Sequence, residues 1–181
     1  PFGADLRETT KDSENLVIRA AKLMTGSDYG VEIELTKNLP LAAGIGGGSS
    51  DAAATLNALT ILLNRSLPTS SEILSLGSDV PVCISNDFQR MQGIGEKITT
   101  LSKPPEIWIV LVNPSLSVST KKVFGLLKNK TNSPLEQPVR VDSRSDFFSY
   151  LARQRNDLEQ VTCLLFPEVK ILLRDILSTK N

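Results

Sequence analysis

The sequence predicts an α+β protein, and three observations support that fold class. Some segments repeat apolar residues at helical spacing, whereas others alternate apolar and polar residues or are short, apolar and β-branched. Helical and strand-like segments are mixed without the strict alternation that is typical of parallel sheets. At 181 residues the chain can form one domain or two small ones, and Pro104-Pro105 marks a candidate boundary.

Before this boundary, the first helix is expected over residues 13–24, where an apolar stripe recurs at helical spacing. Residues 31–37 alternate apolar and polar side chains, which predicts a strand with one face in water. A second helix is expected after a glycine-rich stretch. Its core-facing stripe consists of Ala52, Leu56, Leu59 and Leu63.

A third helix is expected near residues 70–76, ahead of a turn at 77–81 that contains glycine and proline. A strand is expected to run through Cys83 after this turn. Residues 91–101 are expected to form a short strand and a turn.

After the boundary, residues 107–112 are expected to form a buried strand because they are apolar and β-branched, and their tryptophan is expected in the core. Helices are predicted over 119–127, 146–163 and 167–178. The polar stretch 129–145, rich in Asn, Ser, Pro and charged residues, is predicted to be a loop.

The most informative motif is the glycine-rich stretch, which has four glycines within positions 44–48, then Ser49-Ser50-Asp51 and the predicted helix. Such a loop directs backbone N–H groups, hydroxyls and the positive end of a helix dipole at one point, which suits a phosphate. The expected nucleotide-binding residues are Pro40, Leu41, Ala42, Ala43, Gly44, Ile45, Gly46, Gly47, Gly48, Ser49 and Ser50.

The alternative is a flexible turn that happens to precede a helix, but the two serines and the immediate helix favour the phosphate loop. Two better-known phosphate motifs fit poorly. A P-loop requires Lys and Ser/Thr directly after its last glycine, where this chain has Ser49. A dinucleotide-binding fingerprint requires a third glycine at that position and a uniformly apolar strand before it.

The composition excludes several classes of function. Twenty basic residues balance twenty acidic ones, so we expect neither nucleic acid nor a membrane as partner. The chain has no histidine, which excludes Ser-His-Asp catalysis and histidine-ligated metals from this stretch. Its two cysteines do not form a disulfide framework, so a reducing cytoplasm is expected.

Four segments resemble motifs of the GHMP kinase superfamily. Residues 40–52 are similar to its P-x-x-x-G-L-G-G-G-S-S-x-A motif, with Ile45 in place of the usual Leu. The segments Leu76–Cys83, Gly93–Glu96 and Asn156–Glu159 are similar to L-G-A-D-V-P-F/V-C, G-I-G-E and N-D-L-E, respectively. The four matches occur in the family's order, and the last three favour the branch that acts on a cytidine-diphosphate-linked methylerythritol.

The resemblance implies a fold and an activity. An N-terminal ATP-binding domain like ribosomal protein S5 is expected over 1–104, lacking its first strands, and a truncated ferredoxin-like C-terminal domain over 105–181. The implied reaction is transfer of a phosphoryl group from ATP, with Mg²⁺, to the 2-hydroxyl of that small-molecule substrate in isoprenoid precursor synthesis, by a monomer or homodimer. The alternatives are another GHMP kinase, of homoserine or mevalonate type, and a non-catalytic nucleotide-binding module.

Three charged residues are candidates near this chemistry. From the residues alone, Asp79 either caps a turn or faces a cleft, and the resemblance implies that it is the catalytic base. Asp51 either stabilises the first turn of its helix or meets Mg²⁺, and the first role is favoured, so no metal ligand is assigned. Lys37 either touches a phosphate or is solvated, and a solvated lysine is expected. Ser119 is expected to be a helix N-cap.

The chain also departs from the family pattern. It begins without an initiator methionine and lacks the family's N-terminal lysine and the aromatic and histidine residues that grip cytidine. It also lacks the family's glycine-rich motif near the C-terminus. We therefore expect the sequence to be part of a longer protein and to be inactive by itself.

Overall fold

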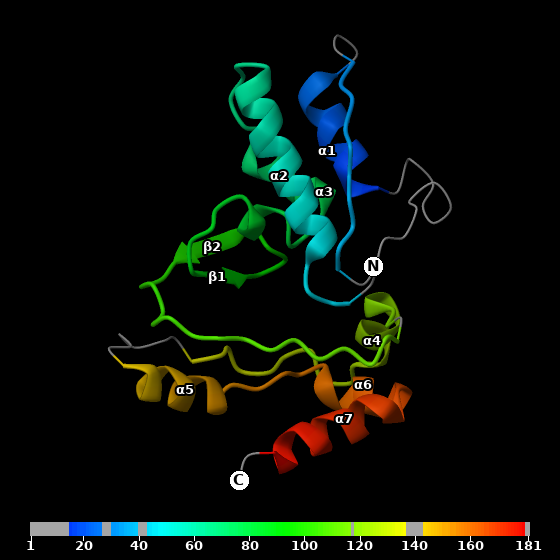
Figure 1. The fold of residues 1–181 in the computed structure, drawn as a ribbon, viewed down its shortest axis with the longest axis vertical. Coiled ribbons are helices and arrows are strands. Elements are labelled where there is room, and N and C mark those ends of the chain that lie inside the picture. The colour runs from blue at the N-terminus through cyan, green and yellow to red at the C-terminus, as the bar shows by residue number, and fades with distance from the viewer. Residues whose placement is uncertain (1–14, 27–29, 40–42, 117, 137–142, 180–181) are drawn as a thin grey trace. The chain divides into compact units, whose positions relative to one another are not determined.

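The computed structural model describes residues 15–26, 30–39, 43–116, 118–136 and 143–179 (Figure 1). These residues form helices and a small antiparallel sheet, which confirms the α+β class. The chain divides into two compact units: the first contains residues 1–40 and 45–103, and the second contains residues 41–44 and 104–181. None of the helices in the described ranges is long and apolar enough to cross a membrane.

Three α-helices build the first unit: α1 (Leu16–Thr25), α2 (Gly47–Leu62) and α3 (Ser70–Leu76) (Figure 1). All three were predicted from sequence. The side chain of Asn15 caps α1 by accepting a hydrogen bond from the Val17 N–H at 3.0 Å. A capping box closes the N-terminus of α3.

The core of this unit lies where α1 and η2 (Pro81–Cys83) pack on α2, and α3 packs on α1 and η2. The predicted stripe of α2 faces this core, with Leu63 partly buried at its edge. The largest fully buried side chains are Leu56, from α2, and Val80, which follows α3. Four alanines, two from α1 and two from α2, also line the contact between these helices and let the two backbones approach closely. The core cluster consists of Ala20, Ala21, Met24, Ala52, Ala53, Leu56, Leu59, Ile73, Leu76 and Val80.

The predicted strand and turn over 91–101 form a complete hairpin of β1 (Gln89–Gln92) and β2 (Lys97–Thr100). The two strands pair antiparallel, with Gln89 opposite Thr100 and Gln92 opposite Lys97. Two glycines with positive φ, Gly93 and Gly95, make the connecting loop.

Two predicted strands are wrong, because no other described segment pairs with either of them. Residues 31–37 and 107–112 belong to no strand of the structure. The expected burial of the second segment is also wrong, since Trp108 is 91% exposed and Val110 is 85% exposed. β-branched composition favours an extended backbone, but a strand forms only when a partner supplies its hydrogen bonds.

Two further predictions need correction. The segment through Cys83 is a 3₁₀ helix, η2 (Pro81–Cys83), because Pro81 fixes φ near the helical value and suits the first position of a helix. The helix expected over 146–163 is two helices, α5 (Arg144–Ala152) and α6 (Glu159–Leu165). Between them, the Asn156 side chain accepts a hydrogen bond from the Leu158 N–H at 3.0 Å, an alternative to helical pairing.

The second unit contains α4 (Thr120–Leu126), α5, α6 and α7 (Pro167–Ser178). Ser119 caps α4 as predicted, and its hydroxyl accepts a hydrogen bond from the Lys122 N–H at 3.4 Å. Residues 129–136, within the stretch 129–145 that was predicted to be a loop, have no helix or strand, but Arg144 and Ser145 at the end of that stretch belong to α5.

Candidate active site

The glycine-rich stretch ends at the N-terminus of α2. Gly46 is the N-cap residue, with φ 72° and ψ 15°, a left-handed conformation that favours glycine, and Gly44 has the same φ. No side chain caps this helix, so the N–H groups of Gly47, Gly48 and Ser49 remain available at its first turn. Together with the positive end of the helix dipole, these groups suit an anion.

The remaining residues predicted for this loop are partly described. Residues 40–42 lie outside the described ranges. Ala43 is half-buried, and Ile45 is 45% exposed. Ser50 is exposed on the first turn of α2, where its N–H donates to the Gly46 carbonyl oxygen at 2.9 Å.

An ion pair joins the segment before the loop to the helix after it. Lys37 Nζ donates a hydrogen bond to Asp51 Oδ2, and the two side chains are only 18% and 30% exposed. The expectation of a solvated Lys37 is therefore wrong. The pair supplies a positive charge next to Asp51, which reduces the repulsion that this carboxylate would exert on phosphates near the first turn of α2.

Asp79 lies on the turn between α3 and η2, and the Val80 N–H closes this turn by donating to the Gly77 carbonyl oxygen at 3.1 Å. The Asp79 side chain is exposed, and its carboxylate accepts no hydrogen bond from the residues that the structure describes. The next side chain, Val80, is fully buried in the core beside α2. A carboxylate in open solvent is therefore attached to a firmly held backbone, and it can accept a proton from a bound ligand.

Sequence analysis missed Arg19, which holds the start of this turn. From α1, its guanidinium donates to the carbonyl oxygens of Ser75 at 2.8 Å and Leu76 at 3.1 Å, the last residues of α3. These contacts span 56 and 57 positions of the chain, so no local pattern indicates them.

The thiol of Cys83 lies close enough to Asp79 to respond to its charge. Burial raises the pKa of the Cys83 thiol above 9.0, and the negative charge of Asp79 raises this pKa further. A raised pKa leaves less thiolate at neutral pH and slows alkylation.

We therefore expect Asp79→Asn to speed the alkylation of Cys83, because the substitution removes one of the two causes of the raised pKa. Iodoacetamide labelling followed by mass spectrometry measures the rate, with Cys163 as the internal standard. Asp87→Asn removes another exposed carboxylate of the same unit and should leave the rate unchanged. Equal rates in both variants would contradict the proximity of Asp79 to Cys83.

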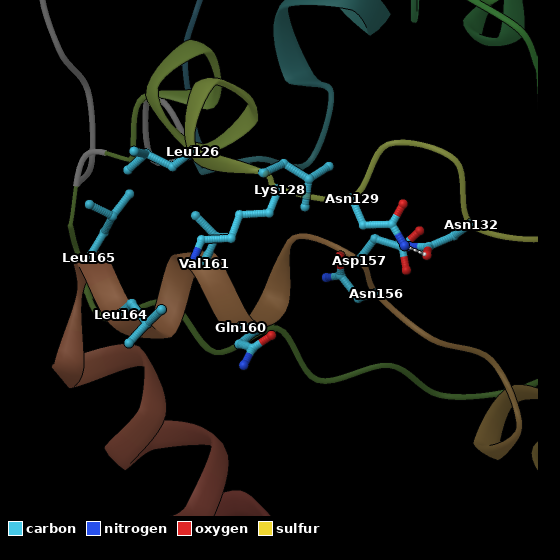
Figure 2. A pocket seen from close by; sticks show the side chains of 11 residues that line it. Leu126, Lys128, Asn129, Asn132, Asn156, Asp157, Gln160, Val161, Leu164 and Leu165 are labelled. Atoms are coloured by element: carbon cyan, nitrogen blue, oxygen red, sulfur yellow. Dashed lines mark hydrogen bonds between the residues drawn. The ribbon is translucent and has the colours of Figure 1, made fainter.

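A separate pocket of about 630 Å³ lies in the second unit, between α4, the segment after it and α6. Figure 2 shows apolar side chains at one end and polar side chains at the other. At the polar end, the Asn129 amide donates to Asn132 at 2.5 Å, and hydrogen bonds from Asn132 and Arg155 lower the pKa of Asp157. The lining residues are Leu126, Leu127, Lys128, Asn129, Asn132, Asn156, Asp157, Gln160, Val161, Leu164 and Leu165.

The similarity of Asn156–Glu159 to N-D-L-E predicts buried polar contacts for Asn156-Asp157-Leu158 in the second domain. This prediction is wrong for Asn156 and Asp157, which are exposed. Both line the pocket, while Leu158 is half-buried.

Comparison with known proteins agrees with these observations. Residues 15–87 match the model of the GHMP kinases N terminal domain. The chain is 48% identical over 160 residues to 4-diphosphocytidyl-2-C-methyl-D-erythritol kinase of Cereibacter sphaeroides, a match that covers 86% of this chain and 56% of the relative. The corresponding kinase of Ruegeria pomeroyi is 47% identical over 163 residues, covering 90% of this chain and 58% of the relative.

A solved structure is also similar. The crystal structure of 4-(cytidine 5'-diphospho)-2C-methyl-D-erythritol kinase aligns with a TM-score of 0.67 and 32% identity, covering 91% of this chain and 62% of that one. The chain thus spans between about half and two thirds of the length of the relatives that it matches. Residues 15–87 thus belong to the N-terminal domain family of the GHMP kinases, and most of the chain is similar in sequence and structure to the kinases named above.

Proposed function

We propose that the protein carrying this chain transfers the γ-phosphoryl group of ATP to the 2-hydroxyl of 4-diphosphocytidyl-2-C-methyl-D-erythritol. The relatives named for this reaction support the proposal, at identities of 47% and 48% over most of this chain. The main structural observation is that α2 begins directly after Gly46, which has a left-handed conformation, and that no side chain caps the helix. The start of this helix lies in the same unit as the exposed Asp79.

In this proposal, the loop from residue 40 to Ser50 holds the triphosphate. Backbone N–H groups form charge-assisted hydrogen bonds to phosphate oxygens without a bulky cation in the site. The pairing of Lys37 with Asp51 supports this role, because it counters a negative charge that lies just beyond the first turn of the helix, where α2 has no acidic residue of its own. The loop belongs to the proposed ATP-binding domain over 1–104, and residues 105–181 belong to the proposed ferredoxin-like domain.

Asp79 is the proposed catalytic base. Its carboxylate accepts the proton of the substrate hydroxyl as the hydroxyl oxygen attacks the γ-phosphorus, and ADP leaves. Phosphoryl transfer depends mainly on positioning and on neutralising charge, so one well-placed carboxylate suffices for the proton.

Mg²⁺ is proposed to enter with ATP. Among the described residues, no group of three or more His, Cys, Asp or Glu side chains is placed to hold a metal ion, and Asp51 is paired with Lys37. A magnesium ion bound with a nucleotide usually takes phosphate oxygens and water as most of its ligands. When bound, it would supply charge neutralisation at the transferred phosphoryl group.

The substrate is tested by coupled release of ADP from the full-length protein. We expect turnover with 4-diphosphocytidyl-2-C-methyl-D-erythritol and none with mevalonate or homoserine. Turnover with either of the latter alone would assign the chain to another GHMP activity. ATP binding without transfer to any of the three would indicate a non-catalytic nucleotide-binding module.

The proposed role of the glycine-rich loop in ATP binding is tested by Gly46→Ala, which places a side chain on a residue with φ 72°. A left-handed residue with a Cβ costs about 1–2 kcal/mol, so we expect the KM for ATP to rise roughly tenfold. Gly46→Asn should have a smaller effect, because Asn tolerates this conformation better.

Gly125→Ala is the matched control for this measurement. Gly125 lies in α4 without positive φ, and a Cβ there meets nothing within 4 Å. An unchanged KM for ATP in Gly46→Ala would contradict the proposed loop.

A further inference from the structure

The loop of the β1–β2 hairpin contacts the backbone of the turn that carries Asp79. Gly95 in this loop is buried and has φ 106°. A Cβ built on Gly95 would overlap the carbonyl oxygen of Ser78 and lie 2.9 Å from its carbonyl carbon and 3.2 Å from its Cα. Backbone therefore meets backbone here, at a distance that only glycine permits. Ser78 is the residue directly before Asp79.

Hydrogen bonds within the hairpin loop hold its conformation. The Glu96 carboxylate accepts a hydrogen bond from the Ile94 N–H at 2.6 Å, and the Gly95 N–H donates to the Gln92 carbonyl oxygen at 3.3 Å. Hydrogen bonds from the backbone also lower the pKa of Glu96, so the carboxylate stays charged at neutral pH. The loop thus presents a fixed surface to Ser78.

Other contacts hold the same turn. The guanidinium of Arg19 binds the carbonyl oxygens at the end of α3, and the side chain of Val80 is fully buried. The hairpin adds a contact at Ser78, between these two anchors. The backbone is held before and after Asp79, while the side chain of Asp79 remains exposed.

We propose that Gly95 is a positioning residue for Asp79: its close contact with Ser78 sets the backbone from which the carboxylate reaches the substrate hydroxyl. This inference rests on the proposed function, because it assumes that Asp79 acts in catalysis. A larger residue at position 95 pushes the Ser78 carbonyl away and displaces the carboxylate. A misplacement of about 1 Å costs on the order of 10²-fold in rate.

The chain offers a matched control in the same loop. Gly93 also has positive φ, 69°, but a Cβ there would meet only the Glu96 carboxylate, the far end of a flexible side chain. Gly93→Ala and Gly95→Ala therefore introduce similar backbone strain. The first also displaces the Glu96 carboxylate from the Ile94 N–H, and only the second places a side chain against Ser78.

The experiment compares the two variants in the full-length protein with saturating ATP and substrate. We expect Gly95→Ala to lower kcat by about 10- to 100-fold with the KM for ATP nearly unchanged. Gly93→Ala should lose comparable thermal stability with little loss of kcat. In an Asp79→Asn background, Gly95→Ala should lower the residual turnover no further than Gly93→Ala does, because both changes act through one carboxylate.

Hydrogen exchange of the peptide covering 77–83 supplies a readout that does not depend on activity. Faster exchange of this peptide in Gly95→Ala than in Gly93→Ala supports the contact between Gly95 and Ser78. If the wild-type protein turned over none of the three substrates, that result would reject the proposed function, but the exchange result would still support the contact. Equal kcat values in the two variants of an active protein overturn the positioning role. Equal exchange in the two variants overturns the contact itself.

Discussion

Replacing Asp79 by Asn is expected to lower turnover by about 10²–10⁴-fold, the loss that follows removal of a general base. The amide keeps nearly the same shape, but it cannot take up the proton of the attacking hydroxyl. Because the α2 N-terminus and its loop are unchanged, ATP affinity should stay close to that of the wild type. Steady-state ADP release measures the first quantity, and calorimetric titration with a non-hydrolysable ATP analogue measures the second.

Asp87→Asn is the control for this prediction. Asp87 is another exposed aspartate of the first unit, where it accepts a hydrogen bond from the Ser85 hydroxyl. It has no place in the proposed chemistry, so its loss should leave turnover within about twofold of wild type, as is usual for surface changes away from a site. Equal turnover in Asp79→Asn and wild type would remove Asp79 from its proposed role.

Replacing Leu56 by Ala is expected to lower the free energy of unfolding by about 2–5 kcal/mol. Leu56 is fully buried on α2, in the core cluster that also contains Val80. Truncation removes apolar contacts and leaves a cavity beneath both the helix of the glycine-rich loop and the turn of Asp79. Urea unfolding followed by circular dichroism measures the loss, and the m-value checks that the transition remains two-state.

Ile61→Ala on the same helix is the matched control. Ile61 is 82% exposed, so its truncation should change the free energy of unfolding by less than about 0.5 kcal/mol. If the two variants lost the same stability, the core would not lie on the face of α2 that contains Leu56.

The helices of the first unit were largely predictable from sequence, because their signals are local. The apolar stripe of α2 repeats within one segment, and Leu56 and Leu59 are buried as predicted. The turn after α3 is likewise encoded by its own residues, since Gly77 and Pro81 delimit it. Such patterns act through neighbours a few positions apart, which is the distance over which helical hydrogen bonds form.

The strand predictions over 31–37 and 107–112 failed for the opposite reason. Residues 107–112 have the composition of a buried strand, yet they pair with no described segment and Trp108 is exposed. A strand depends on hydrogen bonds from another part of the chain, and side-chain preference alone cannot specify that partner.

The glycine-rich stretch before a helix, and through it the expectation of a phosphate site, follows from the sequence by itself, because glycine and helix signals are short-range. The surroundings of that site required the tertiary structure. The pairing of Lys37 with Asp51, the hold of Arg19 on α3 and the contact of Gly95 with Ser78 join residues between 14 and 57 positions apart. Packing of the core brings these groups together, and no local preference encodes which distant groups will meet.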